Sequence, residues 1–426
     1  MRLPIYTLRL PFQRIYVVNS TALIPPLQRQ WRYVSFGAIV IDAGSAVGMS
    51  KEGLAICVAE LARLRAHGNT PTRVGLREWS RKMMVDSTAE AVWGPQNPYR
   101  DPVVAEAWKT FEAGFLTLAM SPFPRLMQPK LYRAREVAAK AMTAYILAGA
   151  YKTASGLVRR RFEHHHDLFH LSFEDIARGK LGNTFAVLGN SAPCALWLLY
   201  QIFSSPTILT SVRAEPSALV THPDAHTATL DLAAVKSSSP ILLSTFQETL
   251  RFRAVNPGPR VLLDDVALPD GTLLKKGAML MIPAPVQHTD TSAWGDDAAA
   301  ARRTNRVAFR AFGGGHVLCP GRHFASMEIL ALAALTVLQF NVVPVAEGEW
   351  REPTWERSPV QAGIPVVDEE IEVELRPREI GREGKVVFSG SGGEVMGIVE
   401  EDVMAGGKGA MGIVEDVKVG GGDIRD

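Results

Sequence analysis

One stretch, residues 312–325, constrains this chain more than any other. It contains three consecutive glycines, then Cys319, then Pro-Gly, and then an apolar pattern with helical spacing. The glycines allow positive φ angles and a close approach of the backbone to a flat ligand. Cys319 stands just before a predicted helix N-terminus, where the helix dipole and free N–H groups favour a thiolate. A thiolate on such a loop suits an axial ligand of haem iron, and the alternative is a buried structural cysteine on a turn.

A long apolar stretch predicts a buried helix with an internal kink. Nearly every residue from 181 to 203 is apolar, which is too rich a composition for a surface helix. The sequence Gly-Asn-Ser-Ala-Pro, from Gly189 to Pro193, lies in its middle. Pro193 cannot donate to the carbonyl of Gly189, so we expect an opened turn where a ligand can approach the backbone. The alternative is a packing kink without a ligand. A capping-box-like pattern at residues 172–175 predicts a separate short helix before it.

Two further features precede the cysteine loop. Glu248 and Arg251 lie at i and i+3 of a helix predicted over residues 241–251, so they share one face and can form an ion pair. Pairs of this kind are common on solvated helix faces, which is the alternative interpretation. Arg260 then begins a predicted strand, and Asp270-Gly271 closes a hairpin. The alternative for Arg260 is a surface position on that strand.

These motifs together resemble one family. The pattern Phe-Gly-Gly-Gly-x-x-x-Cys-Pro-Gly-Arg-x-Phe-Ala is similar to the cysteine-ligand loop of the cytochromes P-450, the haem-thiolate monooxygenases. The resemblance implies a mainly α fold with small β-sheets (α+β) and one large haem-binding core over residues 1–376. It implies haem b as cofactor, with Cys319 as the axial ligand of the iron. The residues implied in cofactor binding are Arg260, Phe312, Gly313, Gly315, His316, Cys319, Gly321 and Ala325.

The same resemblance assigns roles to the kinked helix and to the ion pair. Asn190 and Ser191 would roof the open face of the haem, where most members carry an acid followed by a threonine. An amide cannot carry and release a proton as a carboxylate can. Glu248 and Arg251 would form the buried structural pair of the family. The Gly-Asn-Ser-x-Pro pattern is similar to a branch with the sterol 7-hydroxylases and prostacyclin synthase, which implies a bulky apolar, sterol- or lipid-like substrate. The implied partners are O₂ and an NADPH-dependent reductase.

Some elements of the family pattern are missing. The sequence has no Trp-x-x-x-Arg, which members often use to hold a haem propionate, and Val317 stands where many members have arginine. The Phe-x-Pro-x-Arg-Phe element is also absent between His288 and Arg310, and one of the arginines within residues 302–306 is a candidate to join the Glu/Arg pair instead. Three functions therefore compete: a monooxygenase, a peroxide isomerase on the same scaffold, and a degenerate haem-binding fragment without turnover.

The composition and the start of the chain limit the possible classes of function. A net charge of +2 over 426 residues gives no basis for nucleic-acid binding. The three cysteines do not make a disulfide framework, which favours a reducing compartment. No run of about 18 apolar residues predicts a transmembrane helix, and the start lacks a signal peptide. Eukaryotic members of the suspected family are usually anchored in the endoplasmic reticulum membrane, so we expect this chain to be truncated at its N-terminus, and its localisation is left open.

The remaining pattern gives a coarse secondary structure. Strands are predicted at residues 5–10 and 15–18, and further helices at residues 53–65, 76–92, 102–118 and 133–150. The run His164-His165-His166-Asp167 is interpreted as a polar connection rather than a metal site, because no further ligand is spaced nearby. Residues 377–426 are rich in glycine and acidic residues, so we expect a disordered tail there.

Overall fold

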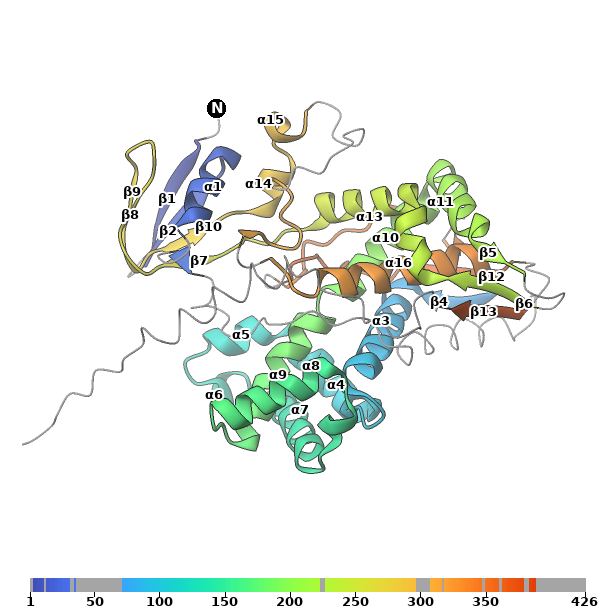
Figure 1. The fold of residues 1–426 in the computed structure, drawn as a ribbon, viewed down its shortest axis with the longest axis horizontal. Helices are drawn as coiled ribbons and strands as arrows, with labels where there is room; N and C mark the ends of the chain where they lie inside the picture. The colour runs from blue at the N-terminus through green and yellow to red at the C-terminus, as the bar shows by residue number, and fades with distance from the viewer. Residues whose placement is uncertain are drawn as a thin grey trace, which may run out of the picture.

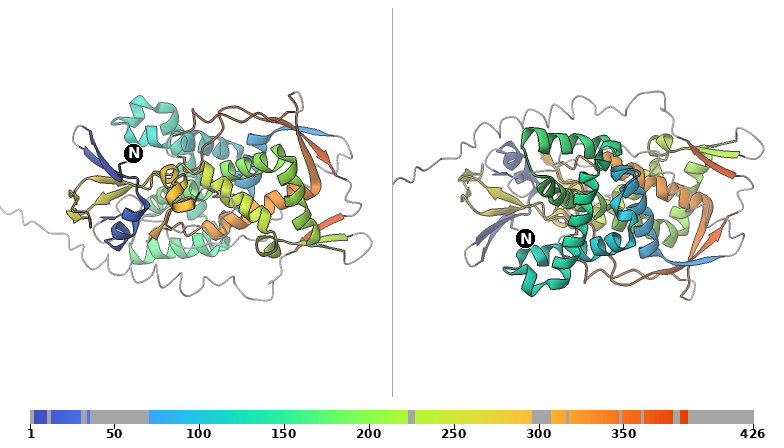
Figure 2. Two further views of the ribbon diagram at one scale, coloured as in Figure 1. Left: turned by 90° about the horizontal axis from the view of Figure 1, so that it is seen from above. Right: turned by 90° about the horizontal axis from the view of Figure 1, so that it is seen from below.

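The computed structural model describes residues 3–10, 13–30, 34–35, 71–222, 227–295, 307–315, 318–346, 349–359, 362–378 and 383–387. Over these residues the chain is mainly helical with small sheets, which confirms the predicted fold class. The strands gather at two ends of the molecule, and the long helices lie between them (Figures 1 and 2). The predicted helix at residues 53–65 lies outside the described residues.

The long helices carry most of the buried surface. In chain order they are α3 (Leu76–Trp93), α4 (Pro102–Ala113), α7 (Pro129–Leu147), α9 (Phe173–Leu188), α10 (Ser191–Ser204), α11 (Pro206–Ala218), α13 (Pro240–Arg253) and α16 (Arg322–Gln339). The shorter helical elements are η1 (Thr21–Leu23), α1 (Ile24–Arg29), η2 (Pro98–Arg100), α5 (Phe115–Met120), α6 (Pro124–Met127), η3 (Ala150–Thr153), α8 (Gly156–Glu163), η4 (His164–Leu168), α12 (Leu232–Ser238), α14 (Ala284–His288) and α15 (Thr291–Trp294). The polar histidine run thus forms η4, a connection between helices.

The largest sheet joins the start of the chain to the segment before the cysteine loop. Its strand order is β1 (Ile5–Leu10), β2 (Gln13–Val18), β10 (Met279–Met281), β7 (Arg260–Leu262) and β3 (Val34–Ser35). The predicted strands in β1 and β2 are confirmed, although β2 begins two residues early because Gln13 pairs with Leu10. β10 runs parallel to β2 and antiparallel to β7, with Leu280 opposite Arg260. Arg260 is therefore held at a fixed position in the sheet.

The remaining strands form smaller sheets. One contains β11 (Phe340–Pro344), β12 (Glu372–Pro377) and β4 (Thr72–Gly75), another contains β13 (Glu383–Val387), β6 (Thr227–Asp231) and β5 (Val220–Thr221), and β8 (Val266–Ala267) pairs with β9 (Leu273–Leu274). β13 lies in the segment predicted to be a disordered tail, yet it pairs in parallel with β6. Pairing with β6 supplies this strand with backbone hydrogen bonds that composition cannot indicate, and the domain boundary at residue 377 stays a prediction. Residues 388–426 lie outside the described part of the chain.

The main hydrophobic core surrounds α10 and α16. Trp197 of α10 and Ala334 of α16 are fully buried, together with side chains from α3 and α13. This confirms the prediction that the apolar helix is a core helix. The combined stretch Phe173–Ser204 is long and apolar enough to cross a membrane by length and composition, but 61% of its apolar window is buried inside the protein. That degree of burial is typical of a core helix, so the stretch is weak evidence for a membrane span.

Two predicted helices are divided differently in the structure. The helix predicted over residues 102–118 is interrupted at Gly114, where a Cβ atom would collide with the side chain of Leu131 on α7. The predicted start of a helix at residues 172–175 is confirmed, but the predicted division between that short helix and a long one from residue 181 is wrong, because α9 continues unbroken to Leu188. Its buried residues Ile176, Ala177 and Leu181 face one core, which favours a single helix. The interruption comes instead at Gly189 and Asn190.

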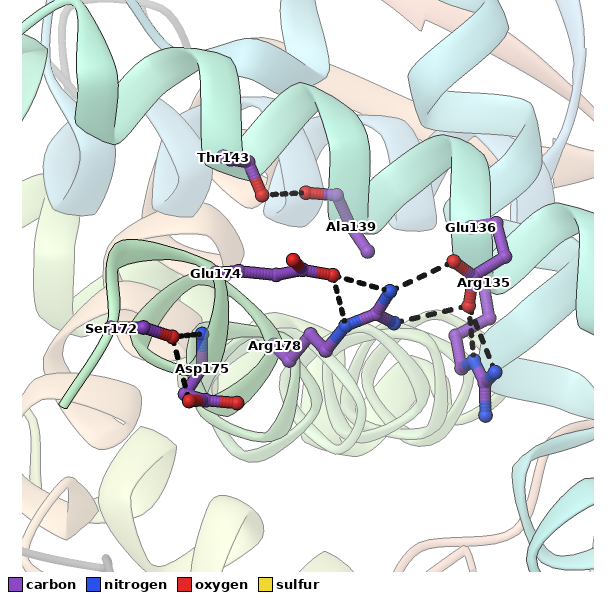
Figure 3. A network of polar contacts seen from close by, with 8 residues as sticks. All are labelled: Arg135, Glu136, Ala139, Thr143, Ser172, Glu174, Asp175 and Arg178. Atoms are coloured by element: carbon purple, nitrogen blue, oxygen red, sulfur yellow. Dashed lines mark hydrogen bonds and ion pairs between the residues drawn. The ribbon is translucent and has the colours of Figure 1, made fainter.

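An ion-pair network fastens α9 to α7. Arg178 of α9 donates to both carboxylate oxygens of Glu136 on α7, at 3.0 and 2.9 Å, and also to Glu174 on its own helix (Figure 3). Arg135 donates to Glu136 as well. These contacts, with the hydrogen bonds from Arg178 as the largest cause, lower the pKa of Glu136 to about 2. The bidentate geometry makes this network a better-ordered link than a single surface pair.

Candidate active site

The described residues of the cysteine loop, 312–315 and 318–321, lead directly into α16. The backbone N–H of Cys319 donates to the carbonyl of Phe312 at 2.8 Å, which closes the loop. Gly313 and Gly315 have φ angles of 78° and 64°, a left-handed region that favours glycine. The N–H of Ala325 donates to the carbonyl of Gly321 at 2.9 Å, in the first turn of α16. Gly313 and Gly315 therefore stand at positions where the backbone conformation favours glycine.

The Cys319 side chain lies just before the start of α16 and is half-buried. Burial raises the pKa of the thiol, while N–H groups of Gly321 and Arg322 and the charge of Arg322 oppose that rise. The expected preference of the helix terminus for a thiolate is therefore outweighed by desolvation in the protein alone. A cationic metal at the sulfur would instead lower the pKa of the thiol, because a thiol that coordinates a metal is deprotonated. The same backbone N–H groups would then stabilise the thiolate.

Two arginines lie buried behind the glycine run. Arg260 of β7 and Arg310 are 7% and 3% exposed. Burial, and to a smaller extent the charge of Arg310, lower the pKa of Arg260 to about 10. With its amide oxygen turned toward the loop, Gln28 of α1 accepts from Arg310 Nη1 and from the Gly315 N–H, both at 3.1 Å. Two buried like charges beside one loop suit an anionic group placed between them.

A chain of hydrogen bonds connects the Glu248–Arg251 pair to this loop. Arg251 Nη2 lies 2.8 Å from Glu248 Oε2, and the Arg251 side chain is 8% exposed. Arg251 Nη1 donates to the carbonyl of His288 at 2.7 Å, and the backbone N–H of Arg310 donates to His288 Nε2 at 2.7 Å. The pair therefore acts through His288 on the segment that carries Arg310. The arginines proposed for this place, within residues 302–306, lie outside the described residues.

His288 is held as a neutral ring in this chain. Its Nε2 accepts from Arg310, so the proton lies on Nδ1, which donates to the carbonyl of Arg251 at 2.8 Å. Burial, together with the charges of Arg251 and Arg310, lowers the pKa of His288 to about 4. The backbone hydrogen bond to Arg251 opposes this shift without overcoming it. His288 consequently links α13 to the segment that carries Arg310, and it adds no positive charge to those of Arg251 and Arg310.

The kinked helix opens at the predicted place. α9 ends at Leu188 with Gly189 as its C-cap, and α10 begins at Ser191. Helical hydrogen bonding resumes where the Cys194 N–H donates to the Asn190 carbonyl at 3.2 Å. The Asn190 side-chain oxygen accepts from the N–H groups of Gly363 and Ile364, at 3.0 and 3.3 Å. Ser191 is buried. Asn190 therefore binds a neighbouring backbone segment with its oxygen, which limits what that atom can offer to a ligand.

Comparison with known proteins decides the family. Residues 60–360 match the family model for cytochrome P450. The chain belongs to the cytochrome P450 family. It is 30% identical over 440 aligned residues to the cytochrome P450 monooxygenase nodJ of Hypoxylon pulicicidum, which covers 91% of this chain and 85% of that protein. It is 28% identical over 293 residues to a cytochrome P450 monooxygenase of Gibberella zeae, covering 64% of this chain and 56% of that protein.

A P450 is an oxidoreductase of the monooxygenase type that carries a haem-thiolate iron, and the family generally uses a redox partner, O₂ and small-molecule substrates. The residues of this chain fit such a group. Cys319 offers a sulfur flanked by backbone N–H groups, the loop glycines adopt positive φ angles, and Arg260 and Arg310 offer positive charge for the carboxylates of the group. Within the described residues no cluster of three or more His, Cys, Asp or Glu side chains forms another metal site.

Some functional positions were missed or lie outside the described residues. His316 and Val317 are not described, so their positions stay predictions. Arg310 was not predicted, although it lies two residues before Phe312. Its position against Gly314 and its contact with Gln28 show that the side chain turns toward the loop, and nothing in the sequence indicates the contact with Gln28.

A buried carboxyl group supports the helix that follows the cysteine. Glu328 of α16 is 2% exposed and accepts hydrogen bonds from Ser87 Oγ and Thr88 Oγ1 of α3. Its Oε2 has no hydrogen-bond partner among the described residues. Burial raises the pKa of Glu328 from 4.5 to about 7, and the two hydroxyl groups only partly oppose this. The P450 therefore keeps this acid protonated in mildly acidic solution.

We expect Glu328 to make stability fall as pH rises. Between about pH 4.5 and 7 the folded protein retains the proton that the unfolded chain releases, so the free energy of unfolding drops across this window and then levels off. The drop is on the order of 3 kcal/mol. Urea unfolding at pH 5 and pH 8 should show this loss in the wild type and a much smaller one in Glu328→Gln. The exposed Glu174→Gln is the control, and an equal loss in Glu328→Gln would contradict the assignment.

Proposed function

We propose that this P450 inserts one oxygen atom from O₂ into a bulky apolar, sterol- or lipid-like substrate, with haem b as cofactor and electrons from an NADPH-dependent reductase. The observation that carries the proposal is the arrangement at Cys319. A half-buried sulfur lies between the Phe312 turn and the start of α16, the buried Arg310 lies against Gly314, and the buried Arg260 lies near Arg310. This is the donor set that a haem-thiolate requires.

Each part of the loop has a proposed task. Cys319 is the axial ligand of the iron, and Phe312, Gly313, Gly315, His316, Gly321 and Ala325 form the surface against which the macrocycle lies. Arg260 and Arg310 bind its carboxylates. When bound, the haem-thiolate supplies the activation of dioxygen, because electron donation from the thiolate favours O–O cleavage. Glu248 and Arg251 act through His288 to hold Arg310 in place.

On the open side, Asn190 and Ser191 are the proposed residues of the substrate and oxygen site. A serine hydroxyl both donates and accepts hydrogen bonds, so Ser191 can hold a water molecule or an oxygen-containing ligand. Asn190 can donate from its amide nitrogen while its oxygen stays on Gly363. The Gly-Asn-Ser-x-Pro pattern is the support for the branch with sterol 7-hydroxylases and prostacyclin synthase, and hence for the substrate class.

A peroxide isomerase is the second candidate function. The amide of Asn190 stands where most members have an acid, and an isomerase that rearranges a peroxide consumes no external protons or electrons. The absence of an acid at this one position favours that alternative.

A spectrum and a turnover assay test the proposal. The purified, reduced and carbon-monoxide-bound protein should show the red-shifted Soret band of thiolate-ligated haem. Incubation with a sterol or lipid panel should then give hydroxylated product only with NADPH and reductase. Product from a lipid peroxide without electrons would favour the isomerase. Protein that binds no haem would support a degenerate fragment and overturn both.

A further inference from the structure

Two side chains lie directly against the glycine run of the cysteine loop. A Cβ atom on Gly314 would collide with the guanidinium of Arg310, and a Cβ atom on Gly315 would lie 3.0 to 3.1 Å from the side chain of Gln28. Gly315 has a positive φ angle of 64°, but Gly314 does not lie in the left-handed region. The close approach of Arg310, rather than backbone conformation, therefore requires a residue without a side chain at position 314.

Gln28 joins these two contacts into one arrangement. With its amide oxygen turned toward the loop, that oxygen accepts from Arg310 Nη1 and from the Gly315 N–H, both at 3.1 Å. An amide oxygen has two lone pairs, so it can accept both hydrogen bonds at once. One half-buried, neutral group thus holds the side chain of Arg310 and the backbone of the cysteine loop together.

The helix that carries Gln28 is fixed to the five-stranded sheet. Ile24 and Leu27 of α1 are fully buried, and they belong to the same hydrophobic cluster as Leu262 of β7. α1 lies beside the strands of this sheet in Figure 1. β7 begins at Arg260, so the sheet that positions α1 also carries the second buried arginine of the site. Gln28 therefore connects the cysteine loop to a rigid part of the fold.

Gln28 holds Arg310 without neutralising its charge. The backbone of Arg310 is already fixed, because its N–H donates to His288 Nε2 at 2.7 Å and its carbonyl accepts from the Gly313 N–H at 2.9 Å. Burial lowers the pKa of Arg310, and the charge of Arg310 in turn helps to lower the pKa of Arg260. A glutamate in place of Gln28 would form an ion pair with the guanidinium, whereas an amide carries no charge. The amide therefore leaves a positive charge that an anionic group can use.

We propose that Gln28 is a neutral positioning residue of this P450, which fixes the Arg310 guanidinium against the cysteine loop and leaves its positive charge to the carboxylates of the haem. This rests on the proposed function, in which Arg310 binds those carboxylates. Gln28 acts through Arg310 and through the backbone of Gly315, so it is not a catalytic residue. Its contribution is to the retention of the cofactor and to the charge around it.

Two substitutions of Gln28 separate this role from a purely structural one. Gln28→Leu removes the acceptor, whereas Gln28→Glu keeps an acceptor and adds a negative charge. We expect both holoproteins to lose haem to excess apomyoglobin about 10-fold faster than the wild type. Gln28→Glu should also have a more negative reduction potential, because the added charge stabilises the oxidised iron. A Gln28→Glu protein with the haem release and potential of the wild type would show a structural hydrogen bond only, and the proposal would be wrong.

Gln30→Glu is the matched control. Gln30 is the C-cap of α1, and its Nε2 donates to the carbonyl of Ala267 at 3.2 Å rather than to the cysteine loop. The substitution adds the same charge two residues farther along the chain, so haem release and the reduction potential should stay close to those of the wild type. Equal effects of Gln28→Glu and Gln30→Glu would show a general effect of added charge and would contradict the specific role of Gln28.

A second measurement follows the hydrogen bond itself. Hydrogen–deuterium exchange of the Gly315 amide in the resting protein should be about 10-fold faster in Gln28→Leu and unchanged in Gln28→Glu, which retains an acceptor. Wild-type exchange in Gln28→Leu would overturn the proposal. If Gln28→Leu does not fold, haem release and the potential of Gln28→Glu decide the question alone. A wild type without the thiolate Soret band would instead refute the proposed function, so the two failures are distinguishable.

Discussion

Replacing Cys319 with serine is expected to abolish the red-shifted Soret band of the reduced, carbon-monoxide-bound protein and all product formation with NADPH. A serine hydroxyl is a far weaker donor than a thiolate, and thiolate donation is what favours O–O cleavage. The loop itself should survive, because its closing bond joins the backbone N–H of residue 319 to the Phe312 carbonyl. The effect should therefore be chemical rather than a loss of fold.

Cys194→Ala is the matched control for this experiment. Cys194 is a second free cysteine, 2% exposed in α10, and burial raises the pKa of its thiol to about 12. It is a core side chain that cannot present a thiolate, so the variant should retain the Soret band with a modest loss of stability. A Cys319→Ser protein that keeps the band would refute the ligand assignment. Circular dichroism of both variants would verify that each is folded.

Removing the carboxyl group of Glu248 should give the second large effect. In Glu248→Ala the guanidinium of Arg251 stays buried with its charge uncompensated, which we expect to cost about 2–3 kcal/mol of stability. Arg251 also binds the His288 carbonyl, and His288 binds the backbone of Arg310. Disturbing the pair therefore displaces a cation beside the cysteine loop, and the haem content per protein should fall together with the stability.

The neighbouring pair Arg253–Glu352 provides the comparison. Its Nη2–Oε1 distance is 2.9 Å, but Glu352 is 72% exposed. Solvent screens such a pair, so Glu352→Ala should cost less than about 1 kcal/mol and leave the haem content unchanged. Urea unfolding and the haem-to-protein ratio measure both variants. Equal losses in Glu248→Ala and Glu352→Ala would show that the Glu248–Arg251 pair has no special structural role.

Much of the site could be predicted because its determinants are local. Gly313 and Gly315 adopt positive φ angles, which the glycine run indicates directly. The pairing of Glu248 with Arg251 follows from their separation by three residues on one helix. The opened turn follows from the missing N–H of Pro193. In each case the relevant atoms are neighbours in the chain, so backbone geometry alone fixes their relation.

The helix boundaries show where local reasoning fails. The interruption at Gly114 depends on a side chain of α7, and the continuity of α9 depends on the core that its apolar face meets. β13 forms a strand because β6 lies beside it, although more than 150 residues separate the two in sequence. Local propensity carries no information about such partners, and tertiary packing overrides it.

The sequence by itself determined the family pattern, the cysteine loop and the kinked helix, since each depends on residue type at a fixed spacing. Only the tertiary structure decided which charges meet at that loop and turn. Arg310 meets Gln28 beside the loop, Glu112 of α4 lies beside Gly189 at the turn, and farther along α16 Glu328 meets Thr88 of α3, each between segments far apart in the chain. The physical reason is that burial and electrostatic pairing depend on distances in space, which are fixed when the helices pack.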